Sequence, residues 1–380
     1  MTTVALAWSR SLSSRASRRL DALGRSWSLA LFVELPILAV GFVVGSAFLI
    51  EFDSLGDFTI FRDAAREVLH GQSPYAAANA EALAGADKFV YPPAAAFLFV
   101  PFALLPLAAA KAAFVAVSLG ATMLALRLLG VRDWRCYGLS LLLAPMITAI
   151  GVGALGPLLL LAAAAAWRYR AMPVVAGLAV VLAVSVKLFL WPLVVWLFAT
   201  RRLRAGALAI LAGTVLVLAP WSAIGFAGLR EYPDLLRTLA DVMRWKAYSP
   251  SALAISLGVP LNATRWGEVV FVAVAIAAIV LLARGRDGDR RSFISAVGAA
   301  LLVTPVVWMH YLVLLLVPLA LTRPRLSPLW LVPLLLWATP RFDSGGDVWR
   351  ILVVLGVVIA ILGAGLDRSR RAVSPARGEH

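Results

Sequence analysis

The sequence predicts an all-α polytopic membrane protein. Hydrophobic residues make up 62% of the 380 residues, the mean hydropathy is +0.90, and only 14% of the residues are charged. Such a composition is too apolar for the surface of a water-soluble domain. Apolar runs long enough to cross a bilayer recur along the chain, and no tract between them is long enough to bury a core of its own. We therefore expect a single polytopic domain over residues 1–380.

The basic residues indicate the orientation of the chain. The formal net charge is +15, and Lys and Arg gather in the short connectors and at the two ends. This distribution follows the positive-inside rule, and no soluble face interleaves basic with aromatic residues, so we expect no nucleic-acid partner. The prediction is a cytoplasmic basic N-terminus at residues 1–27 and a cytoplasmic tail at 367–380. The N-terminal segment is expected to be retained, because the apolar run after it is too long for a signal peptide.

The first predicted span covers residues 28–50, and a first extracytoplasmic loop follows at residues 51–93. Within this loop, apolar residues recur at helical spacing from residue 58 to residue 70. The spacing predicts a short amphipathic helix on the outer membrane surface, with Asp57 as its N-cap.

Residues 94–129 hold more apolar length than one span requires, and Pro101, Pro106 and Lys111 interrupt it. The segment is either a re-entrant entry followed by a span or two short spans, and the first alternative keeps Arg132 inside. A second long extracytoplasmic loop is expected at residues 222–265. Several of the later spans are short, so the predicted count is about 10–12. These spans are approximately 137–152, 157–167, 173–186, 188–199, 205–221, 266–283, 293–306, 311–321, 328–338 and 348–366.

Asp57 is the first candidate for chemistry, because a carboxylate at the water boundary can act as a general base. Spacing alone favours the capping role, in which backbone N–H groups hold the carboxylate and make it a weaker base. Asp53, Asp63 and Glu67 are rivals on the same loop.

Two further ionisable residues stand beside apolar segments. Lys187 interrupts an apolar run, where a charge costs about 2.5–3.5 kcal/mol on insertion scales. Its ammonium either extends to the outer interface or meets a lipid phosphate. His310 begins a later apolar segment and is either a hydrogen-bonded structural residue or an acid–base group.

The second outer loop mixes cations with aromatic residues. Arg244, Trp245, Lys246 and Tyr248 suit a phosphate or a sugar ring, although anchoring at the membrane interface explains the same composition. No second histidine or paired carboxylate lies at metal-ligand spacing from His310, and there is no P-loop, dinucleotide fingerprint or nucleophile elbow. We expect no zinc site, no organic cofactor and no soluble nucleotide donor, and the sequence alone does not decide whether the reaction needs a metal ion.

Several segments of the sequence resemble glycosyltransferase family 87, polytopic enzymes of the C-type glycosyltransferase architecture. The similarity lies in the first outer loop and in residues 304–311, which are similar to the family's Ser-Pro-Val-Ser-Trp-x-His-His/Tyr signature. Gly156-Pro157 stands where the family often has Gly-Gln, and Leu188 follows Lys187 where Pro is common. The matching residues of the first loop are Gly56, Asp57, Phe58, Phe61, Ala64, Ala65, Leu69, Gly71, Pro74, Tyr75, 89–93 and 104–106.

The resemblance implies transfer of a sugar, mannose or a related one, from a polyprenyl-phosphate donor to a glycolipid or glycan acceptor. It implies inversion at the sugar, an active site on the extracytoplasmic side and contacts with membrane lipids. The resemblance reverses the preference for capping and places Asp57 as the catalytic base. The other residues that it points to are Lys187, His310, Arg265 and Arg244 for the donor phosphate, and Tyr91, Trp308, Tyr248 and Trp245 for the sugar or acceptor.

A transporter or lipid flippase is the main alternative, and a non-catalytic membrane scaffold is a third. Coupled transport usually requires ionisable residues at mid-membrane and often leaves internal repeats in the sequence. The predicted spans contain few charges beyond Glu34, Lys111 and Lys187, and no repeat of fixed period is present. These observations favour the transferase.

Overall fold

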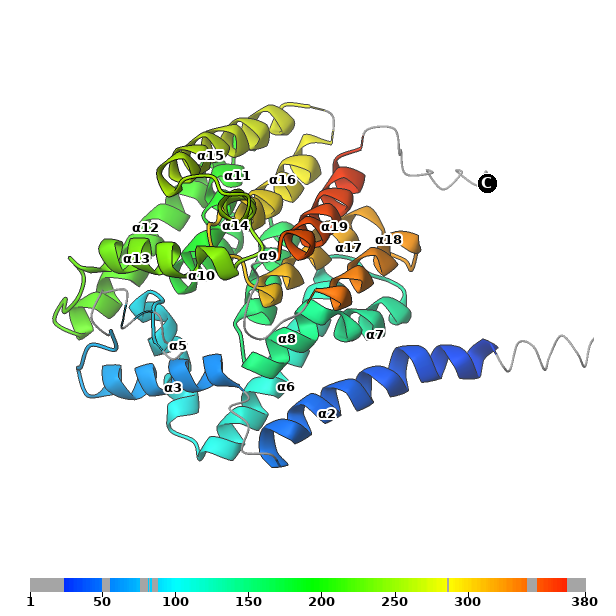
Figure 1. Ribbon diagram of the computed structural model, residues 1–380, viewed down its shortest axis with the longest axis horizontal. Helices are drawn as coiled ribbons and strands as arrows, with labels where there is room; N and C mark the ends of the chain where they lie inside the picture. Colours follow the sequence, from blue (N-terminus) through cyan, green and yellow to red (C-terminus); the bar gives the residue numbers. More distant parts are fainter. Residues whose placement is uncertain are drawn as a thin grey trace, which may run out of the picture.

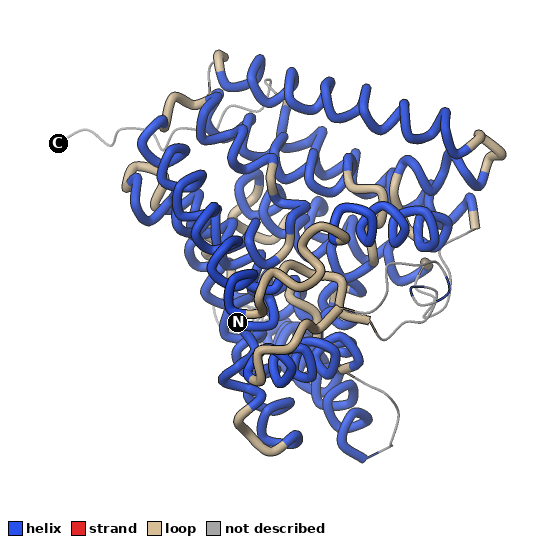
Figure 2. Tube along the Cα trace, turned by 90° about the vertical axis from the view of Figure 1, so that its left-hand side faces the viewer, coloured by secondary structure: helices blue, strands red, loops and turns tan. Residues whose placement is uncertain are grey.

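The computed structural model describes residues 24–49, 55–75, 81, 83, 88–285, 287–339 and 347–367. These residues form helices joined by short loops, with no strand among them (Figures 1 and 2). The all-α prediction is therefore confirmed. The elements are η1 (Ala30–Glu34), α2 (Leu35–Leu49), α3 (Gly56–Leu69), α5 (Pro93–Ala103), α6 (Leu107–Leu128), α7 (Trp134–Leu142), α8 (Ala144–Val152), α9 (Gly156–Arg168), α10 (Pro173–Val186), η2 (Leu188–Leu190), α11 (Pro192–Ala199), α12 (Leu203–Ala223), α13 (Tyr232–Met243), η3 (Arg244–Lys246), α14 (Pro250–Ser256), α15 (Leu261–Ala283), α16 (Gly288–Val303), η4 (Met309–Leu315), α17 (Leu316–Thr322), α18 (Pro328–Leu331), η5 (Val332–Ala338) and α19 (Val348–Leu366).

Prolines set many of the helix boundaries. Pro93, Pro173, Pro192 and Pro328 each lie in the first turn of a helix, where the missing N–H group has no intrahelical partner to lose. Between α5 and α6, Pro106 is the N-cap of the second helix. The segment predicted at 94–129 is thus a short helix followed by one of full length, which agrees with the first of the two alternatives.

Five helices of the described chain are long and apolar enough to cross a membrane, and the bent pair α7 and α8, at 62°, makes a sixth if it is one span. Six shorter apolar helices of 10–17 residues accompany them. The predicted 10–12 spans are reached only when these shorter helices are included. A multi-pass membrane protein follows from the long apolar helices alone.

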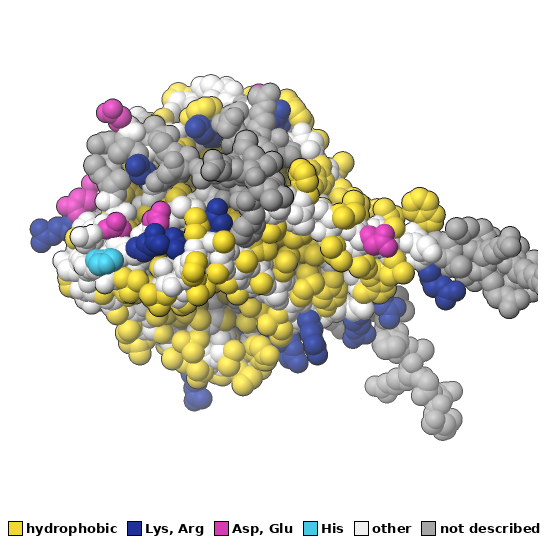
Figure 3. Space-filling model, turned by 90° about the horizontal axis from the view of Figure 1, so that it is seen from below, with side chains coloured by type: hydrophobic (Ala, Val, Ile, Leu, Met, Phe, Trp, Pro, Cys, Tyr) yellow, Lys and Arg dark blue, Asp and Glu magenta, His cyan; other side chains and the backbone are white. Residues whose placement is uncertain are grey.

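The apolar helices expose much of their surface. Phe42 on α2, Leu211 on α12 and Trp266 on α15 are 77%, 68% and 70% exposed. Seen from below, apolar side chains gather over the lower and central part of the face (Figure 3). In water such a surface would aggregate, whereas acyl chains cover it at no cost in unpaired polar groups.

The basic connectors that the topology assigns to one side meet in space. The Asp289 carboxylate accepts hydrogen bonds from Arg170 at 2.7 Å and from Arg202 at 2.7 and 2.9 Å. A second junction joins the N–H of Arg132 to the carbonyl of Pro324 at 2.8 Å. Connectors that are predicted to lie on the same side of the membrane are therefore in contact with each other.

Helix α3 packs against α5 rather than lying free on a surface, with Phe58, Phe61 and Val68 buried. Arg62, expected on the polar face, is also buried, and its guanidinium donates to the carbonyl of Leu105 at 2.9 Å. The polar pattern of the sequence did not reveal this, because the acceptor is a backbone carbonyl freed where α5 ends.

The start of α3 is held against the turn after α8. Leu55 adopts a left-handed conformation with φ 68°, and its N–H donates to the carbonyl of Gly151 at 2.8 Å. Gly153, with φ 71°, lies so close that a Cβ atom there would be 2.5 Å from the Cβ of Phe58. Only glycine satisfies both the conformation and the space.

The second outer loop contains α13, η3 and α14, and α15 starts at Leu261, five residues before the predicted span. An ion network ties α13 to α15. The buried guanidinium of Arg244 contacts Asp241 at 2.9 Å and Glu268 at 3.0 Å, and Arg265 also pairs with Asp241. This network fixes α13 beside the first turns of α15.

Substitution of Gly153 by alanine should destabilise the fold by about 1–3 kcal/mol, because the added methyl group meets Phe58 and the backbone conformation is strained. The measurement is thermal unfolding of the purified protein in one detergent. Gly120→Ala is the matched control: it lies within α6 with nothing within 4 Å of an added Cβ, and it should leave the midpoint unchanged or slightly raised. Equal midpoints for the two variants would contradict the close contact.

Arg244→Gln should lower the free energy of unfolding by about 1–3 kcal/mol, because Asp241 and Glu268 lose their shared cation in a half-buried setting. Arg265→Gln serves as the comparison, since the Arg265 side chain is 40% exposed and its ion pair should contribute less than about 1 kcal/mol. The measurement is chemical unfolding, and a larger decrease in the free energy of unfolding for Arg265→Gln than for Arg244→Gln would contradict this order.

Candidate active site

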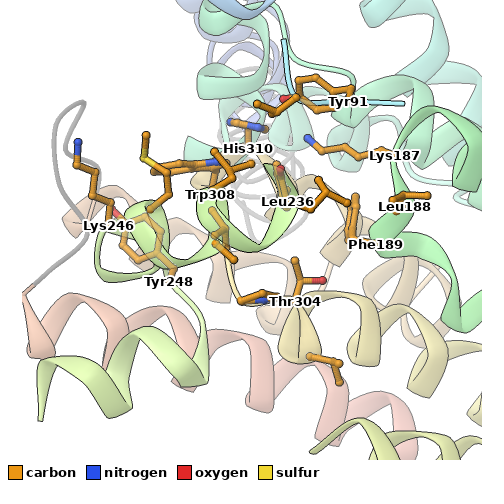
Figure 4. A pocket seen from close by; sticks show the side chains of 18 of the residues that line it. Tyr91, Lys187, Leu188, Phe189, Leu236, Lys246, Tyr248, Thr304, Trp308 and His310 are labelled. Carbon is orange, nitrogen blue, oxygen red and sulfur yellow. The ribbon is translucent and has the colours of Figure 1, made fainter. Parts of the chain in front are cut away.

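A cavity of about 1060 Å³ opens between the first turn of α3, the segment 88–92, the break between α10 and η2, helix α13 and the segment 303–311. Figure 4 shows its lining from close by, with Lys187, His310 and Tyr91 gathered at one end. The cavity collects most of the residues singled out from the sequence, namely Asp57, Tyr91, Lys187, Tyr248, Arg265, Trp308 and His310.

Asp57 lies in the first turn of α3 and is not its N-cap. The cap position belongs to Leu55, and no side chain caps the helix there, so the capping interpretation was wrong. Within the described residues, no hydrogen bond engages the Asp57 carboxylate, whose side chain is 26% exposed. Its place in the first turn still lets the helix dipole stabilise its negative charge. The carboxylate is thus free to react.

His310 faces Asp57 across the cavity. Its Nε2 atom is 4.0 Å from an Asp57 oxygen, is buried, and has no hydrogen-bond partner among the described residues. This separation exceeds a hydrogen bond, but one oxygen atom of a bound molecule could bond both groups. A buried nitrogen without a partner costs free energy, which a ligand oxygen would recover.

Lys187 is buried at the C-cap of α10, where the backbone turns extended with φ −150°. Its Nζ atom lies 3.7 Å from the ring centroid of Tyr311 and 5.0 Å from that of Tyr91. No carboxylate of the described chain is within 4.0 Å of it, so aromatic faces hold the ammonium and leave its N–H groups available. The side chain does not extend to the outer interface.

The surroundings of Asp57 shift the pKa of its carboxyl group toward neutral pH. Burial raises the pKa of the Asp57 carboxyl to about 6, against the opposing attraction of the Lys187 ammonium. Removing a carboxylate from water disfavours its charged form, and one nearby cation offsets part of that penalty. A group with such a pKa is suited to accept a proton near physiological pH.

The aromatic candidates differ in which part of the side chain is left to face the cavity. Tyr91 packs on Phe61, with ring centroids 4.6 Å apart, and presents its ring to Lys187. The Tyr248 hydroxyl donates to the carbonyl of Thr339 at 2.8 Å, so only its ring faces the cavity. Trp308 lies on the wall between His310 and Lys246 (Figure 4).

Two candidates do not line the cavity. Arg244 is held by Asp241 and Glu268, which leaves no carboxylate-free guanidinium edge for a donor phosphate. Trp245 is 46% exposed and lies outside the lining. Both belong to η3, whose third residue, Lys246, does line the cavity.

Sequence reasoning missed two contributions. Tyr311 forms the closest aromatic contact of Lys187, which its place next to His310 could have suggested. Helix α13 supplies an apolar wall through Leu236, Leu239 and Met243, and the helical spacing of these residues in 232–243 is the signal. Among the described residues, no group of three or more His, Cys, Asp and Glu side chains is arranged to hold a metal ion.

Comparison with known proteins now adds to the geometry. The family model of glycosyltransferase family 87 matches residues 89–305. A curated relative, the polyprenol-phosphate-mannose-dependent alpha-(1-2)-phosphatidylinositol pentamannoside mannosyltransferase of Mycobacterium tuberculosis (strain CDC 1551 / Oshkosh), is 25% identical over 300 residues. That alignment covers 71% of this chain and 64% of the relative, so the chain spans less than two thirds of the relative's length. No solved structure matches the chain.

The matched segment contains Tyr91, Lys187 and Arg265, while Asp57 precedes it and His310 follows it. Residues from inside the matched segment and residues from outside it, on α3 and η4, therefore line the same cavity. Because the match covers more than half of the 380 residues, the chain belongs to glycosyltransferase family 87.

Proposed function

We propose that this protein is a membrane mannosyltransferase that moves mannose from a polyprenyl-phosphate donor to a hydroxyl group of a glycolipid or glycan acceptor. The observation that carries the proposal is the convergence of one unbonded carboxylate, one ammonium and one imidazole at the end of a large apolar cavity. Three separate parts of the chain, α3, the end of α10 and η4, supply them.

The chemistry assigns a role to each group. The acceptor oxygen attacks C1 of the mannosyl group and forms the new C–O bond, while Asp57 takes the hydroxyl proton. The bond between C1 and the phosphate oxygen breaks on the opposite face, which inverts the configuration at C1. The electron pair leaves with the polyprenyl phosphate, whose growing negative charge the Lys187 ammonium and an N–H of His310 stabilise.

The shape of the cavity supports a lipid-linked donor. Its volume of about 1060 Å³ lies at the upper end of small-molecule sites. Apolar side chains of α13 and α15, including Leu239, Met243, Val269 and Val272, form one wall. We propose that the first isoprene units lie along this wall, with the phosphate at the end occupied by Lys187.

The curated relative supports the choice of sugar and of acceptor class. Its name specifies polyprenol-phosphate-mannose as donor and a phosphatidylinositol mannoside as acceptor. We extend the donor to this chain because Asp57, Lys187 and His310 can perform that transfer without a nucleotide site. We extend only the broader class, a glycolipid or glycan, to the acceptor.

We further propose that the cavity faces the extracytoplasmic side and that both termini are cytoplasmic. The support is the distribution of charge: the connectors joined through Asp289 are strongly basic, as cytoplasmic loops are. The cavity lies among α3, α13 and the segment 88–92, which belong to the two predicted outer loops. The basic residues at 15–19 and 368–377 lie outside the described residues.

Asp57→Asn should reduce mannosyl transfer about 10²–10⁴-fold, because the amide keeps the shape of the side chain but cannot accept the proton. The assay supplies polyprenyl-phosphate [¹⁴C]mannose, with octyl mannoside and a phosphatidylinositol mannoside as acceptors, to purified protein in liposomes. Asp63→Asn is the control: it removes an acid of the same helix whose side chain is 59% exposed, and it should keep activity within about twofold.

Unchanged transfer by Asp57→Asn would remove Asp57 as the base. Lipid movement across the liposome membrane without transfer to either acceptor would favour a flippase. Folding is checked by gel filtration and thermal unfolding, so loss of the protein is distinguished from loss of the base.

The rate should fall at acid pH. Because only the carboxylate form of Asp57 accepts a proton and its pKa is raised to about 6, kcat/KM should drop about tenfold per pH unit below pH 6. An ordinary aspartate would keep its activity down to about pH 4. A flat profile between pH 5 and 8, or the same acid limb in the residual activity of Asp57→Asn, would contradict this assignment.

A further inference from the structure

A second cavity, of about 810 Å³, shares no lining residue with the first and lies where η1 and α2 run beside α7. It is bordered by the start of the first span, the connector 132–135 and the loop 323–326. Its lining is unusually basic: Gly24, Arg25, Ser28, Leu29, Arg132, Asp133, Trp134, Arg135 and Arg325. We refer to it as the arginine cavity.

Backbone contacts bring the three segments together. The N–H of Leu326 donates to an Asp133 carboxylate oxygen at 3.2 Å, and the N–H of Arg132 bonds the loop as described above. On the other side, Phe32 packs edge-on against Trp134, with ring centroids 6.2 Å apart. Gly138 permits this contact, because a Cβ atom there would overlap the carbonyl of Phe32. The convergence of the arginines is therefore built into the fold.

The charges in the arginine cavity are not balanced. Asp133 is engaged by Arg135, with hydrogen bonds of 2.9 and 3.0 Å. In the part of the chain that the structure describes, the guanidinium groups of Arg25, Arg132 and Arg325 have neither an ion pair nor a hydrogen bond. At the neighbouring basic junction, by contrast, Asp289 pairs with both Arg170 and Arg202. Exposed arginines elsewhere in the described chain, such as Arg201 and Arg204, also have no ion pair, so the distinguishing feature of the arginine cavity is that three such guanidinium groups border one hollow.

The position of the cavity identifies its ligand class. One candidate span starts at Gly24 and the bent span starts at Trp134, so the cavity lies at the boundary between membrane and water. The apolar surface continues from it along the first helix, where Leu29 lines the cavity at 50% exposure and Leu31 follows at 46%. A ligand that fits must offer an anionic group to the arginines and acyl chains to this surface.

We propose that the arginine cavity is a binding site for the phosphate headgroup of an anionic phospholipid, held by Arg25, Arg132 and Arg325. Guanidinium groups bind phosphate oxygens through paired N–H donors, and basic pockets between membrane helices are suited to lipid headgroups. The indole of Trp134, 47% exposed, anchors at the same level of the bilayer. This site is independent of the transfer reaction proposed above.

The test is native mass spectrometry of the purified full chain after incubation with phosphatidylglycerol or phosphatidylcholine. The wild type should retain phosphatidylglycerol in preference to phosphatidylcholine. The variant Arg25→Gln/Arg132→Gln/Arg325→Gln should lower phosphatidylglycerol occupancy roughly tenfold or more, because each basic residue near the surface contributes about a fivefold change in affinity. Arg325→Gln alone, in a loop, should give a roughly fivefold decrease if the triple variant does not fold.

The matched control is Arg201→Gln/Arg204→Gln/Arg284→Gln, which removes the same charge from exposed positions outside the cavity. It should keep phosphatidylglycerol occupancy within about twofold. If the control variant loses as much phosphatidylglycerol occupancy as the cavity variant, the lipid is attracted by the general charge of the interface and the proposed site is wrong. Displacement of the lipid by inorganic phosphate at equal concentration would overturn the lipid assignment in favour of a free phosphate.

Discussion

The approach of α3 to the turn between α8 and α9 is the contact on which the rest of the site depends. The segment 151–156 holds the start of α3 through the carbonyl of Gly151 and the missing side chain of Gly153. It also touches η4, because a Cβ atom at Gly156 would be 3.0 Å from the carbonyl of His310. One short turn thus contacts the segments that carry Asp57 and His310, whose side chains lie 4.0 Å apart, and the missing side chains of Gly153 and Gly156 allow both approaches.

A second constraint is the low polarity around these groups. Lys187 is buried and has aromatic rings as its close neighbours, so its charge is stabilised by ring faces instead of by a carboxylate. A direct ion pair with Asp57 would satisfy both groups and leave neither for a substrate. The observed arrangement keeps a carboxylate and a cation in one cavity without a direct ion pair between them, and the rings of Tyr91, Phe189 and Tyr311 surround the cation.

Hydrophobic length and proline positions predicted most of the fold. The bounds 173–186, 328–338 and 348–366 agree with the structure, because Pro173 and Pro328 start helices and polar residues end them. The predicted N-cap of α3, Asp57, was wrong because Leu55 takes the cap position in a left-handed conformation, held by its hydrogen bond to the carbonyl of Gly151. The role of Arg244 was also hidden, since Glu268 lies 24 residues away and reaches it only after α15 packs beside α13. Local pattern predicts elements, whereas pairing of charges across elements depends on tertiary structure.

The two cavities that we propose as phosphate sites differ in their balance of acidic and basic groups. In the site that we propose for transfer, the Lys187 cation stands near the Asp57 carboxyl group. Once Asp57 has lost to water the proton that it accepted, the polyprenyl phosphate product meets attraction from Lys187 and repulsion from Asp57. A product held by uncompensated cations would leave slowly, and turnover requires release. The arginine cavity has three guanidinium groups without carboxylate partners in the described chain, a balance that suits a ligand meant to stay. If both proposals hold, the number of acids placed beside the bases distinguishes a phosphate that must be released from one that is retained.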